Sequence, residues 1–600
     1  MAFTTPGIDF IAQKAIFPAL LNYGVLYISL YLSRLSVPQW ALVLAAVLPI
    51  PGCTFVGMAY RKWRHQQQAE KLGARLAPVI DSRSIGDGLW EYTEEIGTIF
   101  NCNVVFEDCI YTLEPEHVKR VLATDFDNFP KGERHIEALS GVLGSGVFSS
   151  DGDMWRFHRT MARPFFSRDR VTDLELFDRH IQSAISLMRQ RMSAGYAIDF
   201  QDLMQRITVD SASEFLFGTS VDSLRITVEN LPQPYDHPDY HSSIEAFSFH
   251  PSNRISEAFL RAQMVAAQRD KAGWVWPLLE IFGDRAKKEM KLVNEFIDPI
   301  VETAVKRNVE KVKSNVGEQV KKDIQDDESF LDHLASQTSD KTIVKDQALN
   351  LLLAGRDTIA ATSTFLFYLL SQHPEVSTRL RQEVIDKVGP AKRPTYEDIK
   401  GMKYLRAVIN GALTLHILSP NVPYGVLNQP ETLRILPPVP WDTRECINGT
   451  VWPSPNTNDK PIYIPPGTQV FYGAIMLHTS EDLWGPDAKE FDPDRWIDDR
   501  KQRYIDNPFM FMPFNAGPRI CLGQQLAYNE LSLIVVRFIQ AFSSFTLDEA
   551  ALPPEARVPT EWSHFNGHGR KGKERFRPKV LLTMSSEGGM WLKAKSIEDN

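Results

Sequence analysis

Residues 514–523 read Phe514-Asn-Ala-Gly517-Pro-Arg519-Ile-Cys521-Leu-Gly523, and this stretch decides the fold. A single cysteine stands between two glycines, directly before an apolar helix predicted over residues 522–542. A thiolate at a helix N-terminus is stabilised by unpaired backbone N–H groups and by the helix dipole. Arg519 adds a positive charge two residues away. The pattern therefore favours a cysteine that is kept as a thiolate.

Two interpretations of Cys521 compete. A lone cysteine is most often a buried structural residue. A thiolate held in this way also suits haem iron, where sulfur donation favours O–O cleavage. Gly517 and Gly523 would then let the backbone come close to a large flat group. The spacing of cysteine and glycines alone does not decide, but the whole ten-residue pattern favours haem.

The segment resembles the haem-binding loop of the cytochrome P450 family, which reads FxxGxRxCxG, and further segments resemble that family in the right order. The resemblance covers roughly residues 70–597, and the combination of segments is specific. They are Trp155-Arg-Phe-His-Arg159, Ala354-Gly355-Arg-Asp357-Thr358 and Phe491-Asp-Pro-Asp-Arg495-Trp496. The resemblance implies the cytochrome P450 fold: mainly α, with a minor β-sheet, in a single large haem domain.

The resemblance also implies roles for individual residues. Cys521 would be the axial thiolate of haem b and the only metal ligand from the chain. Phe514, Gly517 and Gly523 would complete the binding loop. Four residues would hold the haem propionates, namely Trp155, Arg159, Arg444 and Arg519. Trp155 and Arg159 are four residues apart, so both face one side of a helix, and their N–H groups can reach one carboxylate; without the other motifs, an amphipathic surface helix would be the simpler interpretation.

Residues 349–370, LNLLLAGRDTIAATSTFLFYLL, are almost wholly apolar and predict a buried helix. By resemblance, Asp357 and Thr358 serve O₂ activation, with Asp357 relaying protons. The Ala354-Gly355 pair is expected to let the helix widen beside the bound O₂. The alternative is that Thr358 bonds the carbonyl four residues back while Asp357 faces solvent.

One motif is displaced. The family's helix K carries ExxR after a lead that residues 403–410, KYLRAVIN, resemble, yet ETLR stands at 431–434, twenty residues later. Deleting residues 411–430, which contain no Asp, Glu, Lys or Arg, restores an uninterrupted helix and its usual exit. We infer that 411–430 is foreign to the fold, with a retained intron as the specific hypothesis and a genuine family-specific insertion as its rival. Glu431, Arg434 and Arg495 would form a structural charge triad, in which losing one partner costs several kcal/mol.

The first sixty residues differ from the rest of the chain. They carry three charges, Asp9, Lys14 and Arg34, whereas 24% of the whole sequence is charged. The apolar runs 15–33 and 40–60 each approach the ~20 residues that cross a bilayer as a helix. Arg61, Lys62 and Arg64 follow, which places that end in the cytoplasm by the positive-inside rule. We expect residues 1–65 to be a membrane anchor with one or two spans rather than a cleaved signal peptide.

The remaining composition narrows the function. The net charge of −9 gives no general affinity for nucleic acid, and five cysteines without a CxxC pair argue against a disulfide framework or zinc ribbon. Residues 66–600 are expected to form one haem domain, even though 600 residues would ordinarily suggest several domains.

By resemblance, the protein is a monooxygenase similar to fungal microsomal enzymes that hydroxylate fatty acids, alkanes and xenobiotics. Its expected partners are the hydrophobic substrate, O₂, membrane lipid and NADPH–cytochrome P450 reductase, with cytochrome b5 as an optional second donor. The expected location is the endoplasmic reticulum membrane, with the haem domain in the cytoplasm. Two alternatives stay open: a haem protein impaired by residues 411–430, and a haem-thiolate isomerase or dehydratase.

Overall fold

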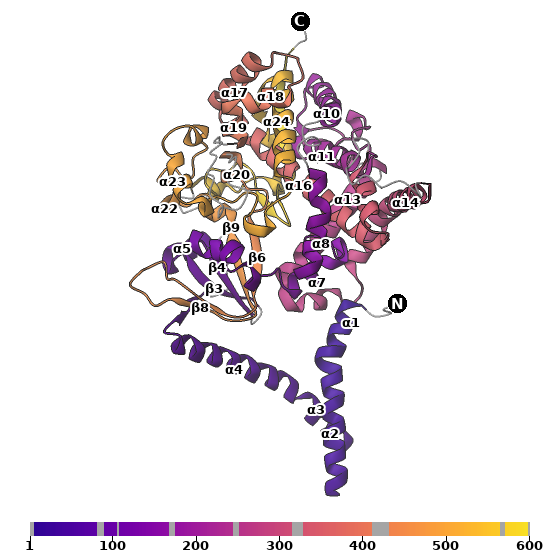
Figure 1. The fold of residues 1–600 in the computed structure, drawn as a ribbon, viewed down its shortest axis with the longest axis vertical. Coiled ribbons are helices and arrows are strands. Elements are labelled where there is room, and N and C mark those ends of the chain that lie inside the picture. Colours follow the sequence, from indigo (N-terminus) through magenta and orange to yellow (C-terminus); the bar gives the residue numbers. More distant parts are fainter. Residues whose placement is uncertain are drawn as a thin grey trace.

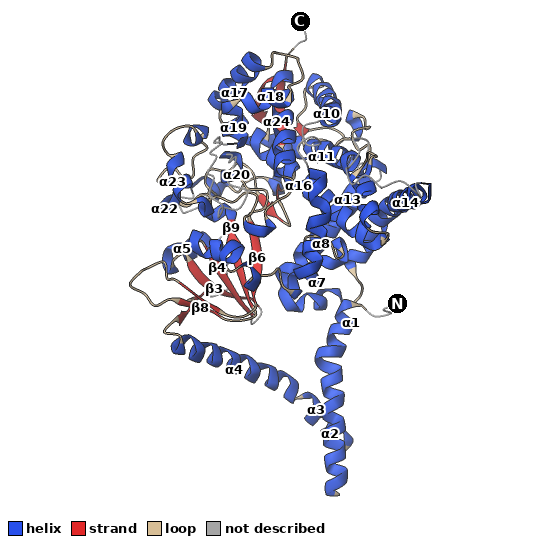
Figure 2. Ribbon diagram, viewed as in Figure 1, coloured by secondary structure: helices blue, strands red, loops and turns tan. Residues whose placement is uncertain are grey.

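Helices make up most of the regular structure, and the described residues add four small sheets (Figure 2), which confirms a mainly α architecture with a minor β component. The structure is a computed structural model, and it describes residues 5–80, 89–104, 107–166, 174–243, 251–314, 328–410, 431–564 and 570–597. In Figure 1 the main sheet lies on one side of the body, and most of the helices lie beside and above it.

The main sheet has five strands in the order β2-β3-β4-β9-β6. The strands are β2 (Val79–Ile80), β3 (Ile99–Val104), β4 (Glu107–Thr112), β6 (Trp441–Cys446) and β9 (Thr468–Gly473). β4 runs parallel to β9, and β6 runs antiparallel to β9 with Arg444 opposite Val470. Alternate residues of a strand share one face, so Asp442 and Arg444 project together from β6.

The other strands form three smaller sheets. They are β1 (Arg75–Leu76), β5 (Ile198–Asp199), β7 (Thr450–Trp452), β8 (Ile462–Ile464), β10 (Phe542–Leu547), β11 (Pro578–Val580), β12 (Met584–Ser586) and β13 (Trp591–Ser596). β13 pairs with both β10 and β5, which ties the C-terminal part of the chain to the helical core.

The described helices of the body are α5 (Leu89–Ile96), α6 (Pro115–Lys119), α7 (Glu133–Leu143), α8 (Gly152–Ala162), α10 (Glu175–Ser193), α11 (Phe200–Phe217), α13 (Pro251–Ala272), α14 (Arg285–Ser314), α15 (Phe330–Gln337), α16 (Lys341–Gln372), α17 (Pro374–Lys387), α18 (Tyr396–Gly401), α19 (Lys403–Asn410), α20 (Glu431–Ile435), α21 (Ala474–Leu477), α22 (Glu481–Trp484), α23 (Lys501–Asp506) and α24 (Gln524–Ala541). The long helix α16 packs against several of these helices, among them α11, α14 and α24.

The ends of α16 follow from the sequence. Asp340 caps its start, because the carboxylate accepts the N–H groups of Thr342 and Ile343. Pro374 cannot continue it and instead begins α17. Between these ends α16 is buried along most of its length in a core shared with α10, α11 and α24. Phe367 of α16, for example, lies between Phe200 of α11 and Phe538 of α24, with ring centres 4.9 and 5.6 Å away.

The N-terminal helices stand apart from this body. α1 (Pro6–Ile11) and a π-helical turn, Ala12–Ile16, lead into α2 (Phe17–Ser33), and α3 (Gln39–Val47) packs back along α2. α4 (Pro49–Lys71) then runs to β1 and the sheet side of the body (Figure 1). Both continuous helical stretches, Pro6–Ser33 and Gln39–Lys71, are long and apolar enough to cross a membrane.

A buried carboxyl group joins two core helices. Ser211 Oγ of α11 donates a hydrogen bond of 2.8 Å to Glu530 Oε1 of α24. Burial raises the pKa of Glu530 to about 8, although the Ser211 bond lowers it. Near neutral pH the folded chain therefore holds this side chain mostly protonated.

We predict that Glu530→Gln removes a pH dependence of stability. The native carboxyl binds its proton more tightly than the unfolded one, whose pKa is about 4.3, so wild-type stability falls by up to about 1.4 kcal/mol per pH unit as the pH rises from about 4.3 to about 8. Urea unfolding across that range should show that the free energy of unfolding of the variant rises relative to that of the wild type as the pH increases. Glu555→Gln, at an exposed site, is the control. Parallel pH profiles for Glu530→Gln and the wild type would contradict the prediction.

Candidate functional site

Cys521 ends a tight loop directly before α24. Its backbone N–H donates to the Phe514 carbonyl at 3.0 Å, and Ile520 N–H donates to the Gly517 carbonyl at 3.1 Å. The Phe514 ring packs edge-on against Tyr528 of α24, with ring centres 5.0 Å apart. These contacts hold the Cys521 side chain one turn ahead of the helix.

The surroundings of Cys521 both oppose and support its ionisation. Cys521 is exposed to solvent, but the protein packed around it raises the pKa of its thiol through desolvation. The Gly523 N–H and the charge of Arg159 act in the other direction. A bound cation at the sulfur would add to these two influences and favour the thiolate.

The two loop glycines differ in the space around them. Gly517 has φ +67°, and a Cβ at this position would lie 1.8 Å from the Leu122 carbonyl oxygen. Gly517 therefore comes close to the backbone after α6. The expected approach of the two glycines to a flat ligand stays a prediction. A Cβ at Gly523 would make only ordinary contacts, 3.8 Å from Phe166 and 4.0 Å from Cys521 Sγ.

Trp155 and Arg159 both lie on α8, and their expected contact with one propionate stays a prediction. Arg159 Nη2 donates to the Ile520 carbonyl at 2.7 Å, which places its charge beside the cysteine loop. The Trp155 ring lies under a different arginine, Arg519, whose guanidinium carbon is 4.5 Å from the ring centre. The four-residue spacing places Trp155 and Arg159 on one face of α8. Their contacts come from the cysteine loop that packs against this face.

A buried cluster of charges surrounds Arg519. Arg444 Nη1 pairs with Asp442 Oδ1 at 2.9 Å, and Lys131 Nζ pairs with the same oxygen at 2.8 Å. Arg519 pairs with Asp151, whose carboxylate also accepts the backbone N–H groups of Lys131 and Gly132. Three cations thus meet two carboxylates.

The pKa values in this cluster reflect its positive excess. Desolvation raises the pKa of Asp442, but Arg444 and Lys131 outweigh it and hold that pKa well below its usual range. Burial, then Arg444, lowers the pKa of Lys131 to about 8. Burial, then Arg444, lowers the pKa of Arg519 to about 10. The cluster is therefore poised to accept a further anion.

Two buried arginine nitrogens in this cluster also favour the binding of an anion. Nε of Arg444 and Nε of Arg519 are both buried, and neither has a hydrogen-bond partner in the part of the chain that the structure describes. Buried donors of this kind ordinarily have an acceptor. Carboxylate groups fit these donors, because guanidinium bonds them strongly.

The sequence did not identify Lys131, Asp151 or Asp442 as part of this cluster. Asp151 directly precedes α8, where an aspartate ordinarily caps the helix. Asp442 stands two residues before Arg444 on one strand, which was the available signal for their pairing. Nothing in the sequence around Lys131 links it to residue 442, since only the fold joins them.

The widening expected in α16 is wrong. The helix stays α-helical throughout Lys341–Gln372, and Thr358 Oγ1 donates to the Ala354 carbonyl at 2.7 Å. This back-bonding is the alternative considered for Thr358. Gly355 instead provides room for α11, because a Cβ there would meet the Ala212 Cβ at 3.5 Å.

Asp357 is buried, so the solvent-facing alternative for it is wrong. Its Oδ1 lies 3.4 Å from Nε of Arg356, which is itself buried. Desolvation raises the pKa of Asp357, while the Arg356 charge and Gln263 of α13 lower it. Among the described residues these contacts link Asp357 to α13, and they do not reach Cys521 or the charge cluster.

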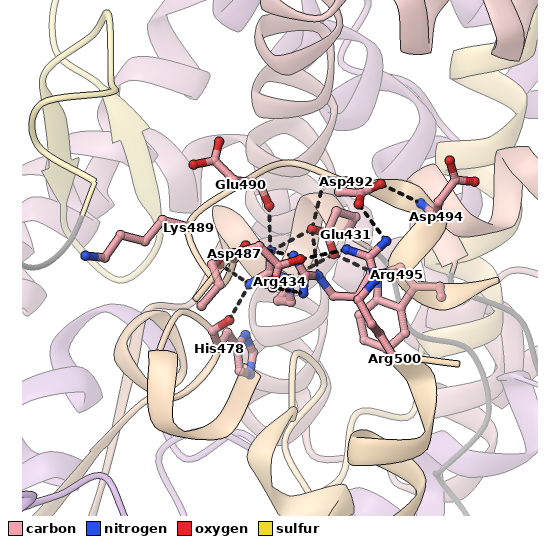
Figure 3. A network of polar contacts seen from close by, with 12 residues as sticks. Glu431, Arg434, His478, Asp487, Lys489, Glu490, Asp492, Asp494, Arg495 and Arg500 are labelled. Atoms are coloured by element: carbon pink, nitrogen blue, oxygen red, sulfur yellow. Dashed lines mark hydrogen bonds and ion pairs between the residues drawn. The ribbon is translucent and has the colours of Figure 1, made fainter. Parts of the chain in front are cut away.

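Glu431, Arg434 and Arg495 come together in the core (Figure 3). Arg434 grips Glu431 with two parallel bonds, Nη2 to Oε1 at 2.6 Å and Nε to Oε2 at 2.8 Å. Arg495 Nε lies 3.5 Å from Glu431 Oε1, and Trp496 Nε1 donates to Oε2 at 2.8 Å. All three charged side chains are almost completely buried.

Arg434 also holds three carbonyls of a distant segment. Its guanidinium donates to the carbonyls of His478 and Glu490 at 2.8 Å, and to that of Ala488. His478 Nε2 in turn accepts the N–H of Met512 at 2.9 Å, just before the cysteine loop. The network therefore joins α20 to the chain that leads into Cys521.

Residues 411–430 lie outside the described residues, but the two helices that flank them meet. Thr432 Oγ1 of α20 donates to the Val408 carbonyl of α19 at 3.1 Å. If residues 411–430 were absent, Thr432 would follow Val408 by four positions, which is the spacing of a threonine bonded to its own helix.

Two comparisons with known proteins agree on the family. The family model for cytochrome P450 matches residues 77–429 and 429–559. The two matches meet at residue 429, near the end of the segment 411–430. Among similar proteins, cytochrome P450 52-E3 of Starmerella bombicola is 35% identical over 504 residues, which cover 80% of this chain and 87% of that protein. Cytochrome P450 52A1 of Candida tropicalis is 34% identical over 467 residues, covering 76% and 77%. Cytochrome P450 52A12 of Debaryomyces hansenii is 34% identical over 463 residues, covering 76% and 80%.

We predict that Gly517→Ala is far more damaging than Gly73→Ala. Both glycines have nearly the same φ, +67° and +66°, but a Cβ at Gly73 meets nothing within 4 Å. The left-handed conformation alone costs about 1–2 kcal/mol, so Gly73→Ala should lose about that much. Gly517→Ala should lose about 2–5 kcal/mol, because it adds a clash with the Leu122 carbonyl. Urea unfolding of both variants measures the difference, and equal losses would contradict it.

Proposed function

The chain belongs to the cytochrome P450 family, whose members are haem-thiolate monooxygenases, and from this premise we propose that Cys521 binds haem b for the hydroxylation of a long apolar substrate. The observation that carries the proposal is the position of Cys521, exposed at the start of α24 beside a buried cluster with unpartnered arginine nitrogens. A neutral structural cysteine would need neither the loop geometry nor the cationic excess beside it.

The donor set fits this cofactor. Haem bound through a thiolate supplies O₂ activation, so that one oxygen atom enters a C–H bond and the other leaves as water, using two electrons and two protons. Cys521 would ligate the iron, with Gly523 N–H and Arg159 favouring the sulfur's negative charge. As the resemblance implies, the propionate carboxylates would be held by Trp155, Arg159, Arg444 and Arg519. Lys131, which shares Asp442 with Arg444, would add a further cation beside them.

Asp357 and Thr358 would take part in proton transfer during O₂ activation. Burial makes Asp357 a better proton carrier near neutral pH than an exposed aspartate, because its raised pKa lies closer to the operating pH. Thr358, whose hydroxyl donates to the Ala354 carbonyl at 2.7 Å, would supply a hydroxyl donor for proton transfer beside Asp357. This acid and alcohol pair argues against the isomerase or dehydratase alternative.

The substrate class and the redox partner are proposed from resemblance. Residues 143–166 resemble fungal microsomal enzymes that act on fatty acids, alkanes and xenobiotics. Electrons would come from NADPH–cytochrome P450 reductase, with cytochrome b5 as an optional second donor. The cationic cluster Arg61, Lys62 and Arg64 supports a haem domain on the cytoplasmic face of the endoplasmic reticulum membrane.

Spectra of the wild type and Cys521→Ser test the proposed haem site. The wild type should give the red-shifted Soret band of its family in a reduced-CO difference spectrum, and Cys521→Ser should lose it while keeping its helical circular dichroism. The same band in Cys521→Ser would refute Cys521 as the ligand. Binding spectra with a chain-length series of fatty acids and alkanes, followed by product analysis with reductase and NADPH, identify the substrate. No spectral response to any member would refute that class.

We also propose one haem domain over residues 66–600, behind an anchor of residues 1–65, with 411–430 as a foreign segment. The Thr432 bond to Val408 and the break in the family match at residue 429 both support an intact helix K without it. Closing a loop of this length costs about 2–3 kcal/mol of chain entropy. This entropy cost is the physical argument for the alternative of a haem protein impaired by residues 411–430.

We predict that deleting residues 411–430 raises stability by about 2–3 kcal/mol and increases haem bound per chain, because the loop-closure cost disappears. A glycine–serine loop of the same length is the matched control and should give no such gain. Haem content and unfolding in urea measure both effects. A deletion that loses haem or stability would show that the segment belongs to the fold. A mature transcript that keeps the segment would refute the intron hypothesis specifically.

A further inference from the structure

The first helix of the chain docks on the body instead of extending away from it. α1 lies against the connector η7 (Gly273–Glu280), which links α13 to α14. Thr5 Oγ1 donates to the Ile281 carbonyl at 2.5 Å, and the rings of Phe10 and Trp274 are 5.8 Å apart. A Cβ at Gly7, the buried residue of α1, would lie 2.6 Å from the Ile281 Cα. The two backbones are therefore in direct contact.

The other end of the anchor meets the same body. Ala69 near the end of α4 packs with Ala74 and Tyr463, and β1 pairs with β8 directly after it. In Figure 1 the body-side ends of α1 and α4 both lie at the body, while α2 and α3 project away from it. Asn22 Nδ2 of α2 donates to the Ala46 carbonyl at 3.2 Å, which fastens the projecting pair together.

Charged residues lie at two levels along the helical stretches Pro6–Ser33 and Gln39–Lys71. A helix needs ~20 residues to cross the ~30 Å hydrocarbon layer. Counting that distance back from Arg34 along α2 leads to Lys14, and counting it forward from Gln39 leads to the cations that begin at Arg61. Lys14 and Arg61 therefore bound the two helices at the same surface, and Arg34 stands alone at the opposite one.

We propose that residues 6–60 form a two-span hairpin whose turn, 34–38, lies across the membrane, so that α1 returns to the side of the catalytic domain and docks on its connector. Four cations, Lys14, Arg61, Lys62 and Arg64, then lie on the domain side and one lies at the turn, as the positive-inside rule requires. With a single span, α2 would carry α1 to the far side, and the contacts with Trp274 and Ile281 could not form.

This arrangement presses the connector against lipid. Gly7 stands about 10 Å beyond Lys14 along the helix, within the headgroup layer. The neighbouring side chains of Leu278, Leu279 and Phe282 are exposed, Phe282 completely so. An exposed apolar patch at this depth is matched by a phospholipid bilayer, and its continuity with the anchor selects lipid over a protein partner.

Glycosylation mapping tests the topology on the full chain in sealed microsomes. One variant carries an acceptor sequon in a flexible spacer between Ser36 and Val37, and the other carries it ahead of residue 1. The turn variant should be glycosylated, and the N-terminal variant should remain unglycosylated and accessible to protease. An N-terminal acceptor that is glycosylated, or a turn acceptor that is not, overturns the hairpin.

A matched pair of glycine variants tests the docking. Gly7→Leu should abolish contact between α1 and the connector, whereas Gly24→Leu, at a helical glycine with nothing within 4 Å, should not. The readout is cross-linking of Phe10→Cys to Trp274→Cys with a short bis-maleimide, assigned by mass spectrometry. A several-fold loss in Gly7→Leu alone supports docking. Equal cross-linking in both variants overturns it.

Thiol labelling tests the lipid contact in phosphatidylcholine vesicles. In water, Phe282→Cys should react faster than Val309→Cys with a soluble maleimide, because Phe282 is 101% exposed and Val309 40%. Contact with lipid should reverse this order in the reconstituted full chain. Faster labelling at position 282 in vesicles would overturn the contact.

Discussion

The buried pair between Glu431 and Arg434 is the interaction on which the architecture around Cys521 depends. Both charges are removed from water, which is tolerable only because each remaining donor and acceptor is satisfied. Arg434 uses its spare N–H groups on the carbonyls of His478, Ala488 and Glu490, and Glu431 accepts Trp496. Through His478 and Met512 the network reaches the loop before the cysteine. A short helix thereby fixes a segment eighty residues away.

A second set of buried charges contains more cations than carboxylates. The Glu431 carboxylate accepts hydrogen bonds at both of its oxygens, whereas Lys131, Arg444 and Arg519 outnumber their two carboxylate partners. The first arrangement stabilises the fold, and the second reserves binding capacity for an anion. Both arise on elements that the long helix α16 and the sheet hold rigid, so neither can relax by moving apart.

The anchor and the body interact at more than the covalent join. α1 reaches the connector between α13 and α14, and α13 also faces Asp357 through Gln263. The membrane-proximal connector and the buried acid on α16 thus share one helix.

By itself, the sequence determined the helical class, the apolar N-terminal segment and the residues of the cysteine loop, since these follow from periodicity, charge depletion and a contiguous motif. It also indicated Glu431 and Arg434, because three-residue spacing on one helix face is a local property. Only the tertiary structure decided that Arg159 bonds the Ile520 carbonyl, that Gly517 makes room for Leu122, and that Lys131 and Asp442 meet across more than three hundred residues. The physical reason is that packing between distant segments selects each side chain's partner, and no local pattern encodes that choice.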